Sequence, residues 1–176
     1  MNDARAIALI GLMGAGKTCV ARALAGRLGH PVEDLDERVE ARAGCTVAEV
    51  FAREGETEFR RREGEALEAA LAAGARVLAC GGGIVLDPGN RARLRERCRV
   101  VWLEVSPREA GRRIEADAVS RPLLAGGPVE ARLKALLRER APFYESIAEL
   151  CVITDGRDPD EVAGVILDAL ATREKS

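Results

Sequence analysis

The segment GLMGAGKT at residues 11–18 constrains the fold of this chain more than any other feature. It fits G-x-x-x-x-G-K-[ST], a glycine-rich loop whose backbone N–H groups converge on phosphate oxygens. An apolar run at residues 6–12 precedes it and a helical pattern at 17–28 follows, so strand, loop and helix stand in the order that this P-loop requires. A glycine-rich turn before a helix would explain the glycines but not that order. The pattern therefore predicts a phosphate site at the positive N-terminal end of the helix.

Within this loop, two side chains carry expected chemical roles. Lys17 is placed to reach the β- and γ-phosphates of a nucleotide, and Thr18 to offer a hydroxyl to Mg²⁺. We predict that backbone N–H groups of the loop, including those of Gly14, Ala15 and Gly16, contact the phosphates.

Length and charge narrow the class of protein. A chain of 176 residues with 47% apolar residues predicts one domain, spanning residues 1–176, with a sizeable core. The net charge of −2 argues against general binding to nucleic acid or acidic membranes. No apolar stretch is long enough to span a bilayer, and the N-terminus lacks a signal-peptide pattern. We expect a cytoplasmic protein, and a monomer because no long apolar surface stripe demands a partner.

The five cysteines do not form a recognisable metal or disulfide pattern. Their number is odd, no two have C-x-x-C spacing, and the single histidine, His30, has no cysteine near it in sequence. We expect most of them to be small buried hydrophobes in a reducing compartment.

Short apolar runs alternate with helical patterns along the chain, which favours an α/β fold with a mostly parallel sheet. Thr46, followed by Glu49, predicts a capping box, and Ser106 predicts a helix cap. We expect strands at 6–12, 31–33, 77–80, 100–105 and 150–154, and helices at 17–28, 47–55, 56–73, 88–97, 128–144 (broken near Pro142) and 158–171. Residues 116–128, with little apolar periodicity and a Gly-Gly-Pro sequence, are predicted to form a mobile lid.

Two acids, Asp34 and Asp36, follow the second predicted strand. Residues at the carboxyl ends of parallel strands face the crevice where ligands bind, so both acids would face the P-loop. One could hold Mg²⁺ through water, and the other could accept a hydrogen bond or a proton from an attacking hydroxyl. The alternative is a solvated acidic turn in which Asp36 caps the next helix.

Three consecutive glycines, Gly81, Gly82 and Gly83, follow the strand VLAC. Such a run costs conformational entropy, so it indicates backbone that approaches a ligand closely, unless it is merely a flexible loop. The strand before it lacks a terminal Asp, which transfers the expected metal role to Asp34.

Three arginines stand in distinctive surroundings: Arg60 in EFRRREGE, Arg121 in SRPLL within the predicted lid, and Arg140 in RAPFYE. Guanidinium groups bind carboxylate and phosphate in a bidentate manner. Surface charge is the alternative for each alone, because nearly all basic residues of the chain are arginine.

Together these segments resemble the shikimate kinase family from the P-loop to about residue 159. The resemblance rests on an ordered set: GLMGAGKT, Asp34 and Asp36, GETEFRRREGEAL, GGG, RPLL and RAPFYESIA. A P-loop alone occurs in many families, whereas the ordered set is far more specific.

The resemblance implies a P-loop kinase of the nucleoside monophosphate kinase type, with three α/β/α layers around a parallel sheet of about five strands. It implies transfer of the ATP γ-phosphate to the 3-hydroxyl of shikimate, in aromatic amino acid biosynthesis, with Mg²⁺ as cofactor. On that pattern Arg60 and Arg140 clamp the substrate carboxylate, Asp36 orients the reacting hydroxyl, and Lys17 and Arg121 stabilise the transferring phosphoryl group. The remaining matched positions are Gly81, Gly82 and Gly83 for shikimate; Phe51, Phe59 and Glu63 on substrate-side helices; Arg113 and Arg157 at the adenine end of ATP; and Thr18 with Asp34 for the metal.

The chain departs from the common family pattern at Cys19, Leu35 and Cys80. Cys19 stands where a second hydroxyl residue usually follows the P-loop Ser or Thr. Its backbone N–H can still bind phosphate, so we expect at most a modest loss of nucleotide affinity. None of the three changes removes a group that the chemistry needs.

Other functions fit the residues less well. A gluconate kinase or nucleoside monophosphate kinase would share the fold, but Arg60 with GGG favours a small anionic polyol as acceptor. A GTPase switch would need D-x-x-G and N-K-x-D, which the chain lacks. A catalytically dead binding protein would not be expected to retain Lys17, Thr18 and both aspartates.

Overall fold

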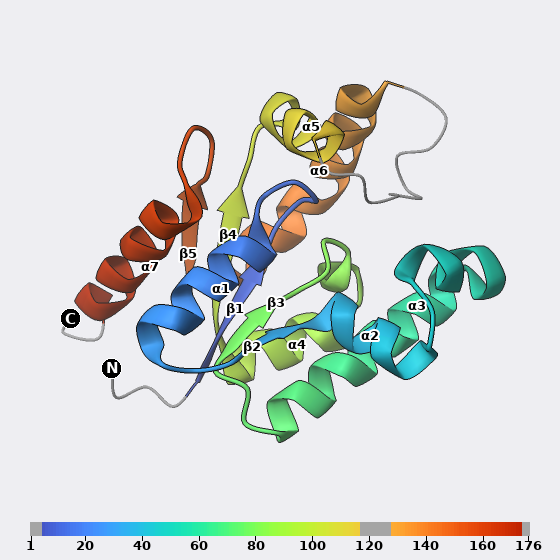
Figure 1. The fold of residues 1–176 in the computed structure, drawn as a ribbon, viewed down its shortest axis with the longest axis horizontal. Coiled ribbons are helices and arrows are strands. Elements are labelled where there is room, and N and C mark those ends of the chain that lie inside the picture. The colour runs from blue at the N-terminus through green and yellow to red at the C-terminus, as the bar shows by residue number, and fades with distance from the viewer. Residues whose placement is uncertain (1–4, 117–127, 174–176) are drawn as a thin grey trace.

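A computed structural model describes residues 5–116 and 128–173 of the chain. Its centre is a sheet of five parallel strands in the order β2-β3-β1-β4-β5 (Figure 1). The elements in chain order are β1 (Ala6–Ile10), α1 (Lys17–Leu28), β2 (Val32–Asp34), α2 (Leu35–Ala43), α3 (Val47–Ala72), β3 (Val77–Ala79), the 3-10 turn η1 (Ile84–Leu86), α4 (Pro88–Arg97), β4 (Cys98–Glu104), α5 (Pro107–Glu115), α6 (Val129–Ile147), β5 (Leu150–Ile153) and α7 (Pro159–Arg173). The α/β fold with its parallel five-stranded sheet is as predicted.

Both faces of the sheet are covered, so the inner strands β1 and β3 are apolar throughout. In β1, Ile7 and Leu9 point into the core that α1 and α7 cover, whereas Ala8 and Ile10 point into the core covered by α3, α4 and α6. All five residues of β1 are buried. This explains why the strand appears in the sequence as a continuous apolar run rather than an alternating one.

β1 pairs in parallel with β3 on one side and β4 on the other, with Leu9 opposite Ala79 and Val101. The carboxyl ends of the strands therefore meet at one edge of the sheet, where the P-loop follows β1. From that edge the α2–α3 pair projects to one side, and α5 with the first part of α6 lies on the other (Figure 1).

Helix α6 corrects one expectation. The predicted break near Pro142 is absent, and the helix continues to Ile147. A proline inside a helix costs on the order of 3 kcal/mol. Here the last turn carries Tyr144 and Ile147, both buried in the core, so their packing offsets that cost.

Helix α3 joins the two helices predicted at 47–55 and 56–73, which run together across Gly55, a residue with a positive φ of 79°. The predicted capping box at its start is present: Glu49 N donates to Thr46 Oγ1, and Thr46 N donates to Glu49 Oε2. Ser106 likewise caps α5 by accepting from Glu109 N.

The cysteines are less buried than expected. Cys80 and Cys98 are buried, Cys45 is half-buried, and Cys19 and Cys151 are exposed. Cys19 faces the cavity described below, and Cys151 lies on the edge strand β5, so neither position is enclosed by neighbouring elements.

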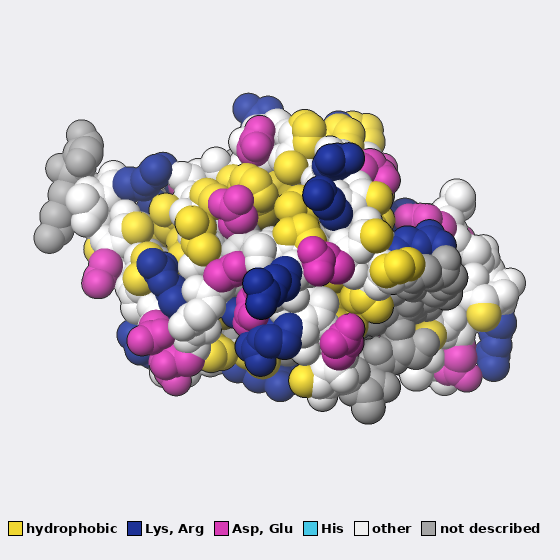
Figure 2. All heavy atoms as spheres, turned by 90° about the horizontal axis from the view of Figure 1, so that it is seen from above, with side chains coloured by type: hydrophobic (Ala, Val, Ile, Leu, Met, Phe, Trp, Pro, Cys, Tyr) yellow, Lys and Arg dark blue, Asp and Glu magenta, His cyan; other side chains and the backbone are white. Residues whose placement is uncertain are grey.

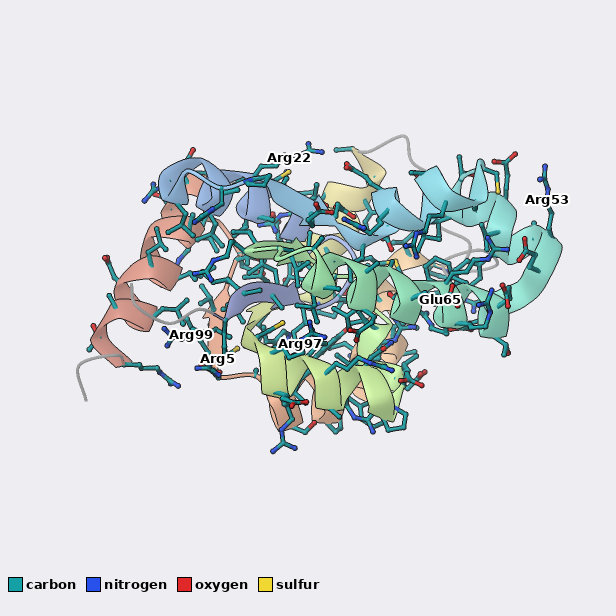
Figure 3. The ribbon with its side chains drawn as sticks, turned by 90° about the horizontal axis from the view of Figure 1, so that it is seen from below. Arg5, Arg22, Arg53, Glu65, Arg97 and Arg99 are labelled. Atoms are coloured by element: carbon teal, nitrogen blue, oxygen red, sulfur yellow. The ribbon has the colours of Figure 1, made fainter. Side chains whose placement is uncertain are left out.

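Charges on the outer surface are mixed. The face shown in Figure 2 has acidic and basic side chains interspersed. At the end of the sheet opposite the P-loop, Arg5 and Arg99 lie near one another (Figure 3), and both bind Glu149. Over the described parts of the chain, none of the helices is long and apolar enough to cross a membrane.

Candidate active site

A cavity of about 1010 Å³ opens at the carboxyl edge of the sheet. The P-loop forms its floor, α2 and α3 contribute one wall, and the ends of α5 and β5 contribute the other. The cavity joins two chemically distinct ends: one lined by the P-loop and the turn after β5, the other by acidic and basic side chains of α2, α3 and α6.

The P-loop carries the backbone geometry that its glycines predict. Gly14 and Gly16 both have positive φ, 81° and 85°, which side chains disfavour. A Cβ on Gly14 would also overlap the backbone of Ala110 in α5. Lys17 Nζ donates to the carbonyls of Gly11 and Leu12, at 3.0 Å each, which places the ammonium beside the loop.

Thr18 and Asp34 connect the P-loop to the end of β2. The Thr18 hydroxyl donates to Asp34 Oδ2 at 2.6 Å, and Asp34 Oδ1 accepts from the backbone N–H of Asp36 at 3.0 Å. Asp34, not Asp36, is thus the N-cap of α2. The alternative in which Asp36 serves as that cap is wrong, because Asp36 is the second residue of the helix, in its first turn, and it lines the cavity.

The hydroxyl and carboxylate oxygens of Thr18 and Asp34 suit Mg²⁺. This ion usually takes one or two protein oxygens and completes its shell with water and substrate phosphate. Among the described residues there is no cluster of three or more His, Cys, Asp or Glu that could hold a metal. A sparse donor set beside a phosphate loop is compatible with Mg²⁺ that arrives with a nucleotide.

On the opposite side, Arg60 is held between two carboxylates of its own helix. Its Nη1 donates to Glu63 Oε2 at 2.8 Å, and its Nη2 donates to Glu56 Oε1 at 3.0 Å. Phe59 packs beneath the guanidinium, whose carbon lies 5.1 Å from the ring centroid, and against Phe51 at 4.6 Å between centroids. Phe59 is 3% exposed, so it belongs to the core as well as to the cavity wall.

Glu63 is an ionisable group with no exposed surface. Burial raises the pKa of its carboxyl to about 7; the Arg60 guanidinium opposes this rise, and the negative charge of Asp36 adds to it. Glu63 Oε1 has no hydrogen-bond partner among the described residues. The carboxyl therefore sits among charges where its protonation can change near neutral pH.

The three glycines make room for these charged side chains. A Cβ on Gly81 would overlap Glu63 Oε1, and one on Gly83 would overlap the guanidinium of Arg60. At Gly82 the nearest atom would be the carbonyl oxygen of Gly11 in the P-loop, at 3.2 Å. The predicted close approach is thus present, but side chains of α3 and backbone of the P-loop are what approach.

Arg140 enters the same end of the cavity from α6. It is 2% exposed, and its Nε has no hydrogen-bond partner among the described residues. Tyr144, one turn later, donates its hydroxyl to the carbonyl of Gly82 at 2.5 Å. A buried cation with an unused donor, near the second cation of Arg60, favours a small anion as the ligand.

At the other end, Arg113 joins three elements. Its Nη1 donates to the carbonyl of Gly14 at 3.3 Å and to Thr154 Oγ1 at 3.2 Å, and its Nη2 donates to the Thr154 carbonyl at 2.7 Å. Its Nε donates to Glu109 Oε1 at 2.9 Å. The turn after Thr154 leads to Arg157, which also lines the cavity.

Comparison with known proteins identifies this arrangement. The family model for shikimate kinase matches residues 13–171. A curated shikimate kinase of Symbiobacterium thermophilum is 46% identical over 168 residues, covering 95% of this chain and 97% of that protein. The chain belongs to the shikimate kinase family. The family and the type of enzyme predicted from the sequence are thereby confirmed.

Solved structures agree with membership of the shikimate kinase family. A shikimate kinase from Acinetobacter baumannii in complex with shikimate superposes with a TM-score of 0.93 at 35% identity, covering 98% of this chain and 96% of that one. A gluconokinase from Sinorhizobium meliloti gives 0.59 at 20% identity, covering 96% and 92%, and shares the fold alone.

In this member of the shikimate kinase family, one cavity collects the predicted site residues that the structure describes. Those lining it are Gly14, Ala15, Gly16, Lys17, Thr18, Cys19, Asp34, Asp36, Arg60, Gly81, Gly82, Gly83, Arg113, Arg140 and Arg157. Arg121 and residues 117–127 of the predicted lid lie outside the described residues.

Sequence reasoning missed two contacts of this site. The pairing of Glu56 with Arg60 has i,i+4 spacing on a helix, so the spacing alone could have indicated it. Thr154 carried no such signal, because its partners Arg113 and Glu104 are 41 and 50 residues away in sequence.

Proposed function

We propose that this protein transfers the γ-phosphoryl group of ATP to the 3-hydroxyl of shikimate, giving shikimate 3-phosphate and ADP. One observation carries the proposal: a P-loop and a pair of largely buried arginines beside an acidic group line the same cavity. The P-loop end fits a triphosphate. The other end fits a small hydroxylated carboxylate, because Arg60 and Arg140 offer fixed cations and Asp36 offers an acceptor for a hydroxyl hydrogen bond.

At the nucleotide end, the N–H groups of Gly14, Ala15, Gly16, Lys17, Thr18 and Cys19 would bind the phosphates. Lys17 would leave the carbonyls of Gly11 and Leu12 and turn to the β- and γ-phosphates. Arg113 and Arg157 would contact the adenine end. Thr18 would hold Mg²⁺ directly and Asp34 would hold it through Thr18 or water, and the bound ion would neutralise charge on the phosphates.

At the acceptor end, Arg60 and Arg140 would bind the carboxylate of shikimate. This leaves the ring hydroxyls near Asp36, whose carboxylate would orient the reacting hydroxyl and accept its hydrogen bond. Phosphoryl transfer needs in-line placement and charge stabilisation more than covalent help, and a cavity shared by both ends provides the placement. That Arg121 stabilises the charge on the transferring phosphoryl group remains a prediction.

The decisive experiment is ADP release from MgATP with and without shikimate, with the product identified by mass. Shikimate-dependent release with a phosphorylated product supports the proposal. Release that is indifferent to shikimate contradicts it. Gluconate and a nucleoside monophosphate should be run as alternative acceptors, and we expect neither to match shikimate.

A further inference from the structure

Thr154 has an unusual concentration of hydrogen bonds for a residue at a strand end. It directly follows β5 and is 2% exposed. Its backbone N–H donates to the carbonyl of Glu104 at 2.9 Å, and its hydroxyl donates to the same carbonyl at 3.2 Å. Because the hydroxyl proton is directed at Glu104, the lone pairs of Oγ1 remain for a donor on the other side.

That donor is Arg113. Its guanidinium donates two hydrogen bonds to Thr154, from Nη1 to the hydroxyl oxygen and from Nη2 to the carbonyl oxygen. The same carbonyl accepts from the backbone N–H of Arg157 at 3.2 Å. Thr154 therefore forms hydrogen bonds with Arg113 and Arg157, two of the arginines that line this end of the cavity.

The hydrogen bonds of Arg113 occupy the edge of its guanidinium group and leave the flat face available to a ligand. Its edge donates to Thr154, to the carbonyl of Gly14 and, through Nε, to Glu109. A guanidinium whose edges are bonded offers its flat face, and guanidinium faces stack well on planar rings. The orientation of that face is set by the groups on its edge, of which Thr154 supplies two.

We propose that Thr154 is a positioning residue that holds the guanidinium of Arg113 face-on to the base of the bound nucleotide. The inference rests on the proposed function, because it takes the cavity to bind ATP. Thr154 does not reach the phosphates or the acceptor in this account; it acts through Arg113. The Thr154 hydroxyl thus determines affinity for the base, and not affinity for the triphosphate.

The test compares ATP with inorganic tripolyphosphate, which has the phosphates but no base. Thr154→Val has nearly the same shape without the hydroxyl, and Thr154→Ser keeps it. We expect T154V to weaken ATP binding about fivefold or more, the scale of one lost hydrogen bond. The affinity for tripolyphosphate, the KM for shikimate and kcat at saturating ATP should each change by less than about twofold, because no hydrogen bond to the phosphates or to the acceptor is lost. T154S should restore ATP affinity.

Two further variants separate positioning from general loosening. In an Arg113→Ala background the T154V change should have no further effect on ATP affinity, because the residue through which Thr154 acts is gone. Thr172→Val removes a hydroxyl that bonds the Asp168 carbonyl on the exposed end of α7, and it should change none of these constants.

The proposal is overturned if T154V weakens tripolyphosphate and ATP equally, if it leaves ATP affinity unchanged, or if its effect persists without Arg113. These binding measurements need no acceptor. If the unmodified protein lacks shikimate-dependent ADP release, the proposed function fails, while the comparison of ATP with tripolyphosphate still decides the role of Thr154.

Discussion

The hydroxyl of Thr18 donates to Oδ2 of Asp34 at 2.6 Å, which joins the first turn of α1 to the end of β2. The other oxygen of Asp34 caps α2, so one carboxylate orients both the proposed metal-binding hydroxyl and the helix that carries Asp36. A fixed outer partner of this kind usually matters for metal affinity nearly as much as the ligand itself.

Asp34→Asn should therefore raise the Mg²⁺ concentration needed for half-maximal activity by about 10–100-fold. The amide can still cap the helix, so the free energy of unfolding should change little. The measurement is activity against Mg²⁺ concentration at fixed ATP. Asp87→Asn is the matched control, because Asp87 caps α4 in the same way, by accepting from Asn90 N. An unchanged Mg²⁺ curve for D34N would contradict the assigned role.

Asp36→Ala should bind ATP normally and lose phosphoryl transfer. A positioned acid–base group typically contributes about 10²–10⁴-fold to rate, so kcat should fall within that range. ATP binding measured by calorimetry and kcat measured by ADP release separate the two effects. Normal turnover by this variant would disprove the proposed role of Asp36.

Glu56→Gln should lower the KM for shikimate. Glu56 occupies two donors of Arg60, with Nε at 3.3 Å and Nη2 at 3.0 Å, and we expect the substrate carboxylate to need the same donors. Because the Glu56 side of this ion pair is exposed to solvent, the pair should contribute little free energy, so the KM for shikimate should fall by about 1.5–5-fold with kcat unchanged. The matched control is Glu65→Gln on the same helix (Figure 3), which removes a partner of Arg61 outside the cavity. A KM that rises in E56Q would show that Glu56 supports Arg60 rather than competing for it.

Gly83→Ala should weaken shikimate binding without affecting ATP binding. The added Cβ would overlap the Arg60 guanidinium, which must move, whereas the P-loop is untouched. We expect the KM for shikimate to rise about tenfold or more, consistent with displacing a bidentate cation, and the affinity for ATP to hold. Gly26→Ala is the control: Gly26 lies within α1 with open space around it, so alanine there should stabilise the helix by about 0.5–1 kcal/mol. Weakened ATP binding in G83A would contradict the prediction that the substitution affects only shikimate binding.

The raised pKa of Glu63 should make the stability of the protein depend on pH. Its folded pKa is about 7 against an ordinary value of 4.5, so between these values the folded protein holds a proton that the unfolded chain releases. The free energy of unfolding should therefore fall as pH rises through this window, by at most about 1.4 kcal/mol per pH unit for one group.

Glu63→Gln, which cannot ionise, should lack that decline, and the difference between the two proteins in denaturant unfolding measures it. Glu58→Gln is the control: hydrogen bonding to Arg61 lowers the pKa of the half-buried Glu58 to about 2, so its titration lies below the window. Parallel pH profiles for E63Q and the unmodified protein would contradict the prediction.

Much of the fold follows from local pattern. The run at residues 6–12, the loop motif and the helix start at Lys17 specify a strand, a phosphate loop and a helix from neighbouring residues alone. The helix predicted at 88–97 matches α4 (Pro88–Arg97), and the structure shows local features that fix its start, the proline at its first position and the Asp87 cap. Pro142 shows the limit: its local signal predicts a break, but burial of the next turn keeps the helix intact.

The sequence by itself determined the P-loop, the parallel α/β architecture, the family and the identity of the charged groups, because each depends on residue types at short spacing. Only the tertiary structure decided how those groups meet. It made Asp34 the cap, placed Glu63 in a dry environment that raises its pKa, and put Gly81 and Gly83 against the side chains of α3. It also brought Thr154 to Arg113 across 41 residues. Burial and contacts between segments distant in sequence form only when the chain folds, so no local sequence pattern predicts them.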